Sequence, residues 1–287
     1  MHSDCVQPIL FEHLDIRGAL VSLDRSWREL AAGRSYPEAV LKLLGEMSAV
    51  TCLIAANLKQ PGRMTFQLRG DGEVNLLVLD CDEQLRLRGM ARGREAGVAG
   101  NPTARQLLGN GQLLLTLDAE GMRQPYQSLV PLEGDGIAAI FEHYLDLSEQ
   151  QPTRLLLAAD DRRAVGLLAQ KLPDADRKDE DGWNRVMRLL DTLTPAEHLA
   201  HSPLDLLRRL FPEEDTRVFA PRPVSHHCPD DPEKIHAMLR GLGRAECDAI
   251  LKDKGEIHVR DDICNRDYRF DAEALEAVFA APGHRMH

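Results

Sequence analysis

Residues 62–78 read GRMTFQLRGDGEVNLLV, and this stretch decides the fold class of the first half of the chain. Apolar side chains alternate with polar ones on both sides of a Gly-Asp-Gly turn, namely Met64, Phe66 and Leu68 before it and Val74, Leu76 and Val78 after it. A period of two is typical of a half-buried β-strand, and a glycine-rich turn between two such runs is typical of a hairpin. The stretch therefore predicts an antiparallel β-hairpin.

The same alternation recurs further along the chain. Residues 113–117 and 126–132 predict a second pair of strands. Between the two pairs lies a segment rich in glycine and arginine, 88–102, whose glycines lack the spacing of a phosphate-binding loop. We interpret this segment as a mobile surface loop.

Helices are expected next to these strands. Residues 35–59 predict a long helix that begins with a capping box of Ser35 and Glu38, and 136–147 predict a second helix. Helices beside a hairpin-rich antiparallel sheet indicate the α+β class.

The chain divides into three parts by composition and pattern. Residues 1–173 predict the N-terminal α+β domain, 174–222 a helical linker, and 223–287 a small α+β C-terminal domain. The amphipathic helices of the linker, near 183–190 and 203–211, are too short to be stable alone and need another surface on which to bury their apolar sides. The linker is therefore a candidate for a segment that docks and undocks.

Charge and composition exclude several classes of protein. The 287 residues carry 46 acidic and 35 basic side chains, a net charge of −11, which disfavours nucleic-acid binding. The longest weakly polar stretch, 47–58, has about 12 residues, short of the roughly 20 that a membrane span needs. The N-terminus has no secretory pattern. We expect a soluble, cytoplasmic protein with no membrane or nucleic-acid partner, and the absence of common catalytic motifs predicts that it is not an enzyme.

The C-terminal domain contains the one constellation with metal chemistry. Helices are expected at 231–242 and just before Gly255, and a strand–turn–strand is expected at 257–270, with Asp271 capping a last helix. A domain of about 65 residues often needs a metal or a disulfide to be stable.

Two short motifs in this domain hold possible zinc ligands. His226 and Cys228 precede the first helix, and Asp261 and Cys264 lie at the hairpin turn. Imidazole, thiolate and carboxylate all bind zinc, and structural zinc sites are usually four-coordinate, so the set is a candidate zinc site, although carboxylate is an unusual ligand in a structural site. The alternative is a turn aspartate with two packed cysteines.

The remaining candidates are interpreted as structural. Cys52 lies on the predicted long helix and is expected in the hydrophobic core. Cys247 is expected to be a packed cysteine rather than a substitute zinc ligand. Glu197, His198 and His201 are interpreted as an exposed helix end rather than as a site.

Segments along nearly the whole sequence resemble the heat shock protein 33 family of redox-regulated chaperones. They are YPEAVLKLLGE (36–46), LKQPGRMTFQLRGDG (58–72), GNGQLLLTLD (109–118), SEQQPTR (148–154), LLAQKLPDAD (167–176), RLFPEEDTRVF (209–219) and the run from LRGLGRAECD to DAEAL (239–275). The resemblance implies an ATP-independent holdase of the stress response that binds unfolding or oxidatively damaged client proteins. In the family, four cysteines in a CxC…CxxC pattern hold zinc, and oxidation forms disulfides, ejects the metal, unfolds the domain with its linker, and yields an active homodimer.

This sequence departs from that pattern at the ligand positions. They hold His226, Cys228, Asp261 and Cys264, so only the redox-switch candidates Cys228 and Cys264 remain as cysteines. Three outcomes are open: zinc bound by the mixed set, a disulfide between the two cysteines, or a metal-free domain held by packing. A disulfide would stabilise the domain, by about 4 kcal/mol on the loop-entropy account, and would invert the family's logic.

One other function fits the cysteine content. A thiol–disulfide oxidoreductase could use the C-terminal cysteines, although exchange catalysts usually pair two thiols closely in sequence, which this chain does not.

Overall fold

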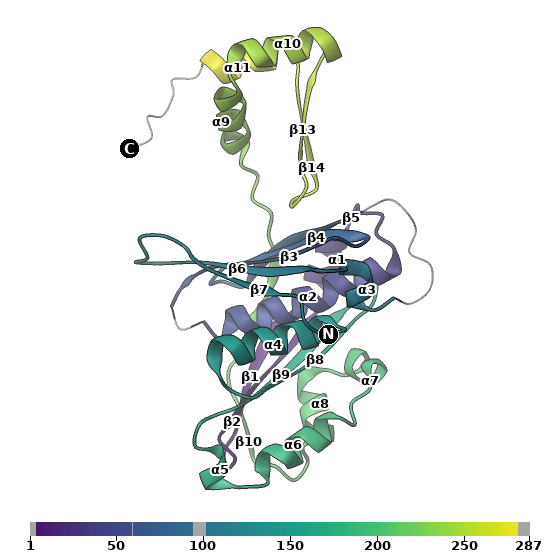
Figure 1. Ribbon diagram of the computed structural model, residues 1–287, viewed down its shortest axis with the longest axis vertical. Coiled ribbons are helices and arrows are strands. Elements are labelled where there is room, and N and C mark those ends of the chain that lie inside the picture. The colour runs from purple at the N-terminus through teal and green to yellow at the C-terminus, as the bar shows by residue number, and fades with distance from the viewer. Residues whose placement is uncertain (1–3, 59, 94–101, 281–287) are drawn as a thin grey trace. The chain divides into compact units, whose positions relative to one another are not determined.

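The computed structural model describes residues 4–58, 60–93 and 102–280 and divides into two compact units, Met1–His227 and Cys228–His287. Both units combine helices with antiparallel strands (Figure 1), which confirms the predicted α+β class. The first unit contains two six-stranded sheets, and the second contains a two-stranded sheet.

The predicted hairpin lies at the centre of one sheet of the first unit. Its strands are β3 (Gly62–Gly70) and β4 (Val74–Cys81), with Met64 opposite Cys81 and Arg69 opposite Leu76. The second predicted pair is also confirmed, as β6 (Gly111–Ala119) and β7 (Tyr126–Pro131). The order across this sheet is β12-β5-β4-β3-β6-β7.

The interpretation of 88–102 as a loop is wrong for its first part. Residues 88–93 belong to β5 (Arg86–Gly93), which pairs with β4 along its length. The backbone N–H and C=O groups of β5 thereby find partners, despite the glycines and arginines that weaken the strand pattern. Residues 94–101 lie outside the described part of the chain.

The other sheet joins segments that are far apart in sequence. Strands β1 (Cys5–Phe11) and β2 (Ile16–Leu23) pair with each other, and β2 also pairs with β9 (Ala164–Lys171), which pairs with β8 (Thr153–Ala159). On the outer side of β1 lie β10 (Thr216–Val218) and β11 (Arg222–Pro223). The order is β10-β1-β2-β9-β8, with β11 beside β1.

Helix α2 (Glu38–Ala56) lies between the two sheets together with α4 (Ile137–Glu149), which is close to its predicted range (Figure 1). Short helices α1 (Arg25–Ala31) and α3 (Ala104–Leu108) complete this part of the unit. The predicted capping box is wrong: α2 begins at Glu38, after Pro37, and no side chain caps its first turn. Because Pro37 lacks an N–H and holds an extended backbone, the helix starts directly behind it.

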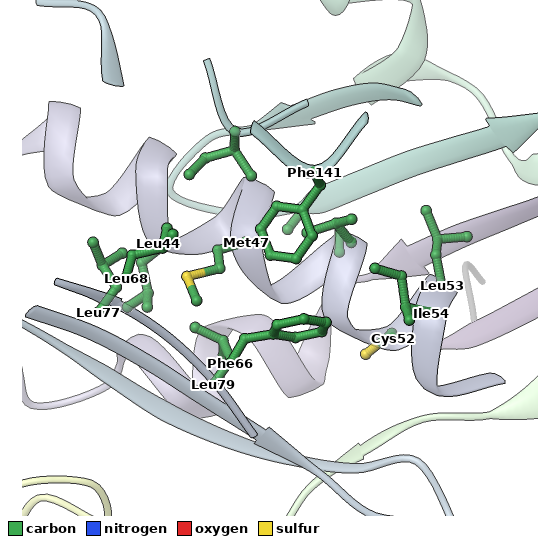
Figure 2. Packing of buried hydrophobic residues seen from close by; sticks show 14 of the residues in the cluster. Leu44, Met47, Cys52, Leu53, Ile54, Phe66, Leu68, Leu77, Leu79 and Phe141 are labelled. Carbon is green, nitrogen blue, oxygen red and sulfur yellow. The ribbon is translucent and has the colours of Figure 1, made fainter. Parts of the chain in front are cut away.

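Apolar side chains from α2, α4 and the hairpin form the main core (Figure 2). Phe66 of β3 and Phe141 of α4 meet edge to face, with ring centroids 4.8 Å apart. Gly45 lets α2 approach β8, since a Cβ at that position would lie 2.5 Å from the Cβ of Ala159.

Among the described helices, α2 alone is long and apolar enough to span a membrane. Its 19 residues exceed the apolar stretch of about 12 residues that the sequence indicated. The structure buries 72% of that window inside the unit, as in the core helix of a folded domain.

Residues 174–222 contain four helices before the chain joins the sheet through β10 and β11. They are α5 (Ala175–Lys178), α6 (Gly182–Leu190), α7 (Pro195–Ala200) and α8 (Pro203–Leu210). Helices α6 and α8 pack on the side of the β1-β2-β9 sheet that faces away from α2 (Figure 1).

The second unit follows the predicted order of elements. Helices α9 (Pro232–Leu242) and α10 (Arg244–Lys254) precede the hairpin of β13 (Ile257–Asp261) and β14 (Arg266–Phe270), and α11 (Ala272–Ala280) follows it. Asp271 caps α11 as predicted, since its Oδ1 accepts a hydrogen bond from the N–H of Ala274 at 2.8 Å. The core of this unit is small: Ile235, Leu239, Cys247, Ile257, Phe270, Leu275 and Val278.

Candidate functional site: a disulfide and a covered apolar sheet

A disulfide joins Cys228, which precedes α9, to Cys264 in the turn between β13 and β14. Their Cα atoms are 5.5 Å apart, and 36 positions separate them in sequence. The guanidinium of Arg266 supports the same junction, because its Nη2 donates to the carbonyl oxygen of Cys228 at 2.9 Å and its Nη1 lies 3.1 Å from the Asp230 carboxylate. The disulfide therefore ties the start of the unit to its hairpin.

Asp261 shapes the turn that carries Cys264. One carboxylate oxygen, Oδ1, accepts hydrogen bonds from the backbone N–H groups of Ile263 and Cys264, both at 3.1 Å. Asn265 completes the turn with a left-handed backbone (φ 52°), a conformation that asparagine adopts more readily than most residues. In the disulfide form, this aspartate has the role of a turn residue.

The fourth predicted ligand, His226, belongs to the first unit. It lies in β12 (Ser225–His226), which pairs in parallel with β5 and places His226 opposite Leu87. The structure thus brings two of the four predicted ligands into contact, places Asp261 in the same turn, and holds His226 in another sheet.

Zinc does not fit these residues in their disulfide form. Zinc takes thiolates as ligands, and the sulfurs of Cys228 and Cys264 are bonded to each other. Over the described residues, no group of three or more histidine, cysteine or acidic side chains could hold a metal ion.

The other described thiols are buried or half-buried. Cys52 and Cys81 have no exposed surface, and they lie in the main core, where Figure 2 labels Cys52. A hydrogen bond with Cys81 and burial raise the pKa of the Cys52 thiol well above its ordinary value. Cys247 is fully buried as predicted, and its thiol donates to the carbonyl of Leu239 at 3.7 Å. Burial also raises the pKa of Cys247. Buried thiols with raised pKa values are poor nucleophiles.

A second feature of functional interest is the apolar sheet surface beneath the helices of 174–222. Buried side chains of β1, β2 and β9 meet buried side chains of α6 and α8 and of Phe211, which follows α8. The strands contribute Ile9, Phe11, Ile16, Leu20, Leu167 and Ala169, and the helical side contributes Val186, Leu190, Leu206, Leu207, Leu210 and Phe211. We call the six strand residues the covered sheet surface. The rings of Phe11 and Phe211 meet edge to face at 4.9 Å. Sequence patterns gave the amphipathic helices but not the surface that they cover, because β1, β2 and β9 show no clear alternation.

The interpretation of 197–201 as an exposed helix end is wrong for His198. Glu197 is exposed and forms a capping box with Thr194, in which the backbone N–H of Thr194 donates to the Glu197 carboxylate at 3.0 Å. His198, the next residue, is only 4% exposed. Burial, together with the nearby Arg163 guanidinium, lowers the pKa of His198 to about 4. A neutral, buried imidazole therefore belongs to the docked form of α7.

Comparison with known proteins identifies the family. The family model described as Hsp33 protein matches residues 4–271. The chain belongs to the Hsp33 family. Among curated Hsp33 relatives, a 33 kDa chaperonin from Methylobacillus flagellatus is 39% identical over 279 residues, which cover 96% of this chain and 94% of the relative. A 33 kDa chaperonin from Pseudomonas aeruginosa is 40% identical over 288 residues, which cover 98% of this chain and 96% of the relative.

A solved structure supports the same fold. The crystal structure of a 33 kDa chaperonin (heat shock protein 33 homolog) from Thermotoga maritima matches with a TM-score of 0.82 and 23% identity, covering 97% of this chain and 98% of that chain. The predicted Hsp33 membership and the predicted fold class are thereby confirmed.

Proposed function

We propose that this Hsp33-family protein is an ATP-independent chaperone that holds unfolding client proteins on its covered sheet surface. The observation that carries the proposal is that short amphipathic helices cover a broad apolar sheet. An isolated helix of eight or nine residues is marginal in water, so α6 and α8 depend on the sheet for their structure. Release of these helices would unfold them and expose the strands beneath.

The energetics suit a releasable cover. Burial of an apolar side chain stabilises docking by about 1.5–3 kcal/mol, and ordering the backbone of each linker residue opposes docking by about 1–2 kcal/mol. Docking is therefore the difference between two opposing contributions, and a loss of buried apolar contacts shifts it toward release. The exposed strands would then offer an apolar surface to an unfolded segment of a client.

The cysteine pair supports an altered form of redox regulation. Oxidation by a peroxide joins the thiols of Cys228 and Cys264, and the two electrons and two protons reduce the peroxide to water. Closing this loop constrains the unfolded chain and stabilises the second unit by about 4 kcal/mol. We therefore propose that oxidation strengthens the C-terminal unit, and that heat rather than peroxide releases the linker helices.

Zinc binding by the reduced protein remains a prediction. Reduction frees two thiolates beside Asp261, and His226 is the remaining predicted ligand. Metal analysis of the reduced, purified protein tests it: about one zinc per chain is expected if the mixed set binds, and loss of zinc from a Cys264→Ser variant would assign the site.

Light scattering of a heat-unfolding client tests the holdase activity. We expect the protein to suppress aggregation on heating without ATP, and peroxide to weaken this suppression. Absence of suppression in reduced, oxidised and heated protein alike would refute the proposal. A Cys228→Ser variant should lose the peroxide effect, and Cys5→Ser, which leaves the disulfide intact, should retain it.

The setting of this activity is also proposed. The protein would act in the cytoplasm, without catalytic turnover, and the active form would be a homodimer. Size-exclusion chromatography with and without heating tests the dimer.

The alternative function is that of a thiol–disulfide oxidoreductase, which would use the half-buried Cys228–Cys264 pair. Catalytic reduction of insulin disulfides by the protein, abolished in Cys264→Ser, would favour that alternative.

A further inference from the structure

Helix α7 is anchored to the neighbouring sheet by one arginine, and it buries one histidine. Arg163, in the turn between β8 and β9, donates through Nη1 to the carbonyl of Leu199 near the end of α7, and through Nη2 to Ser22 Oγ of β2 at 2.9 Å. His198 is buried beside it. The guanidinium therefore links the helix end to the sheet, next to the imidazole.

The surroundings of His198 offer no compensation for a positive charge. The cavity that it lines has about 10 Å³ of free space, close to the minimum for one water molecule. Apart from His201, which is in the same segment, the other lining residues are neutral: Leu20, Val21, Ser22, Val165, Pro203 and Leu206. Arg163 is the charged group whose field reaches the imidazole, and its own Nε is buried without a hydrogen-bond acceptor.

The acidic groups of the neighbouring elements lie elsewhere. Asp160, in the same turn as Arg163, accepts hydrogen bonds from the backbone N–H groups of Arg162 and Arg163. From α2, Glu38, Lys42 and Glu46 line a separate hollow of about 370 Å³, which α7 borders through Pro195 and Leu199. Among the described residues, no carboxylate offsets the effect of Arg163 on the imidazole. One side of α7 also faces a hollow instead of packed side chains.

We propose that α7 is an acid-sensitive latch: protonation of His198 beside Arg163 places two cations in one buried site and releases the helix. Release of α7 would loosen the linker between α6 and α8. The effect of this release on client binding rests on the proposed function, whereas the release of α7 itself is independent of it.

The direction of the pH dependence follows from the two states. The docked form holds the pKa of His198 near 4, below its ordinary value of 6.5 in the undocked form. The contribution of neutral His198 to the free energy of docking is therefore fully present above pH 6.5, and it is lost as the pH falls toward 4. Between pH 7.5 and pH 5, the ratio of docked to undocked α7 should fall about 30-fold.

Hydrogen exchange in the full-length protein measures this ratio directly. Protection factors for 194–201, corrected for the chemical exchange rate at each pH, should fall about 30-fold from pH 7.5 to pH 5 in the wild type. In His198→Leu they should change less than about threefold, because the imidazole that becomes charged beside Arg163 is gone. The matched control is His201→Gln, three residues away in the same segment, which should retain the wild-type acid response.

The result that overturns the proposal is an equal acid-induced fall in the wild type and in His198→Leu, or a response abolished by His201→Gln. If His198→Leu fails to dock at pH 7.5, His198→Gln replaces it with a polar side chain that does not titrate. Client aggregation is then measured at both pH values. Undocking in acid without a gain in client holding would contradict the proposed function and leave the latch intact.

Discussion

Replacing Phe211 by alanine should destabilise the docking of the linker helices on the apolar sheet and should leave the strand residues unchanged. Phe211 follows α8 directly, is 4% exposed, and packs its ring edge to face against Phe11 of β1 at 4.9 Å. Truncation of a buried phenylalanine to alanine typically costs about 3–5 kcal/mol, because packing is lost and a cavity remains. The site lies at the end of a helix that can relax, which favours the lower value.

A loss of about 3 kcal/mol corresponds to a roughly 160-fold increase in the ratio of undocked to docked linker helices. We therefore expect Phe211→Ala to bind an apolar fluorescent dye and to suppress client aggregation at a lower temperature than the wild type. The matched control is Leu204→Ala in the same α8, because Leu204 is 42% exposed and its loss should change stability by no more than about 0.5 kcal/mol.

Activation of Phe211→Ala at the wild-type temperature, with its fold intact by circular dichroism, would contradict this prediction. Activation of Leu204→Ala at as low a temperature as Phe211→Ala would contradict it as well. Hydrogen exchange at β1 and β2 separates release of the cover from unfolding of the unit, because only the latter removes protection from the whole sheet.

Three further perturbations test other parts of the account. Reduction of the disulfide, or Cys228→Ser, should lower the free energy of unfolding of the second unit by about 4 kcal/mol, measured as hydrogen-exchange protection in α9 and α10; reductant should have no added effect on the variant. Burial raises the pKa of Glu46 to about 7, so the wild type should lose stability relative to Glu46→Gln as the pH rises from 5 to 8 in urea titrations; Glu38→Gln on the same helix keeps Glu46 and should retain the wild-type fall. Gly45→Ala should lower the melting temperature because its Cβ would meet Ala159, while Gly241→Ala, whose Cβ meets nothing within 4 Å, should be neutral or slightly stabilising.

The elements that were predictable from sequence are those that local pattern determines. The hairpin of β3 and β4 alternates strictly around a glycine turn, and α9 carries its own cap at Asp231. The β1-β2-β9-β8 sheet was missed because its strands come from distant segments, and β9 is buried along almost all of its length and shows no alternation. Tertiary contacts, rather than propensity, define such strands.

The site was predictable in part for a similar reason. The HxC and DxxC motifs singled out Cys228 and Cys264, and the resemblance allowed their disulfide as one of three outcomes. The position of His226 depends on β12 pairing with β5, and the burial of His198 depends on docking of α7. Neither contact leaves a local signal in the sequence.

Hydrogen exchange of the full-length protein with a bound, heat-unfolded client tests the central claim most directly. In that complex we expect the linker helices within 182–211 to lose protection while the hydrogen-bonded strands β1, β2 and β9 beneath them keep theirs. Retained protection across α6 and α8 in the client-bound protein would contradict it.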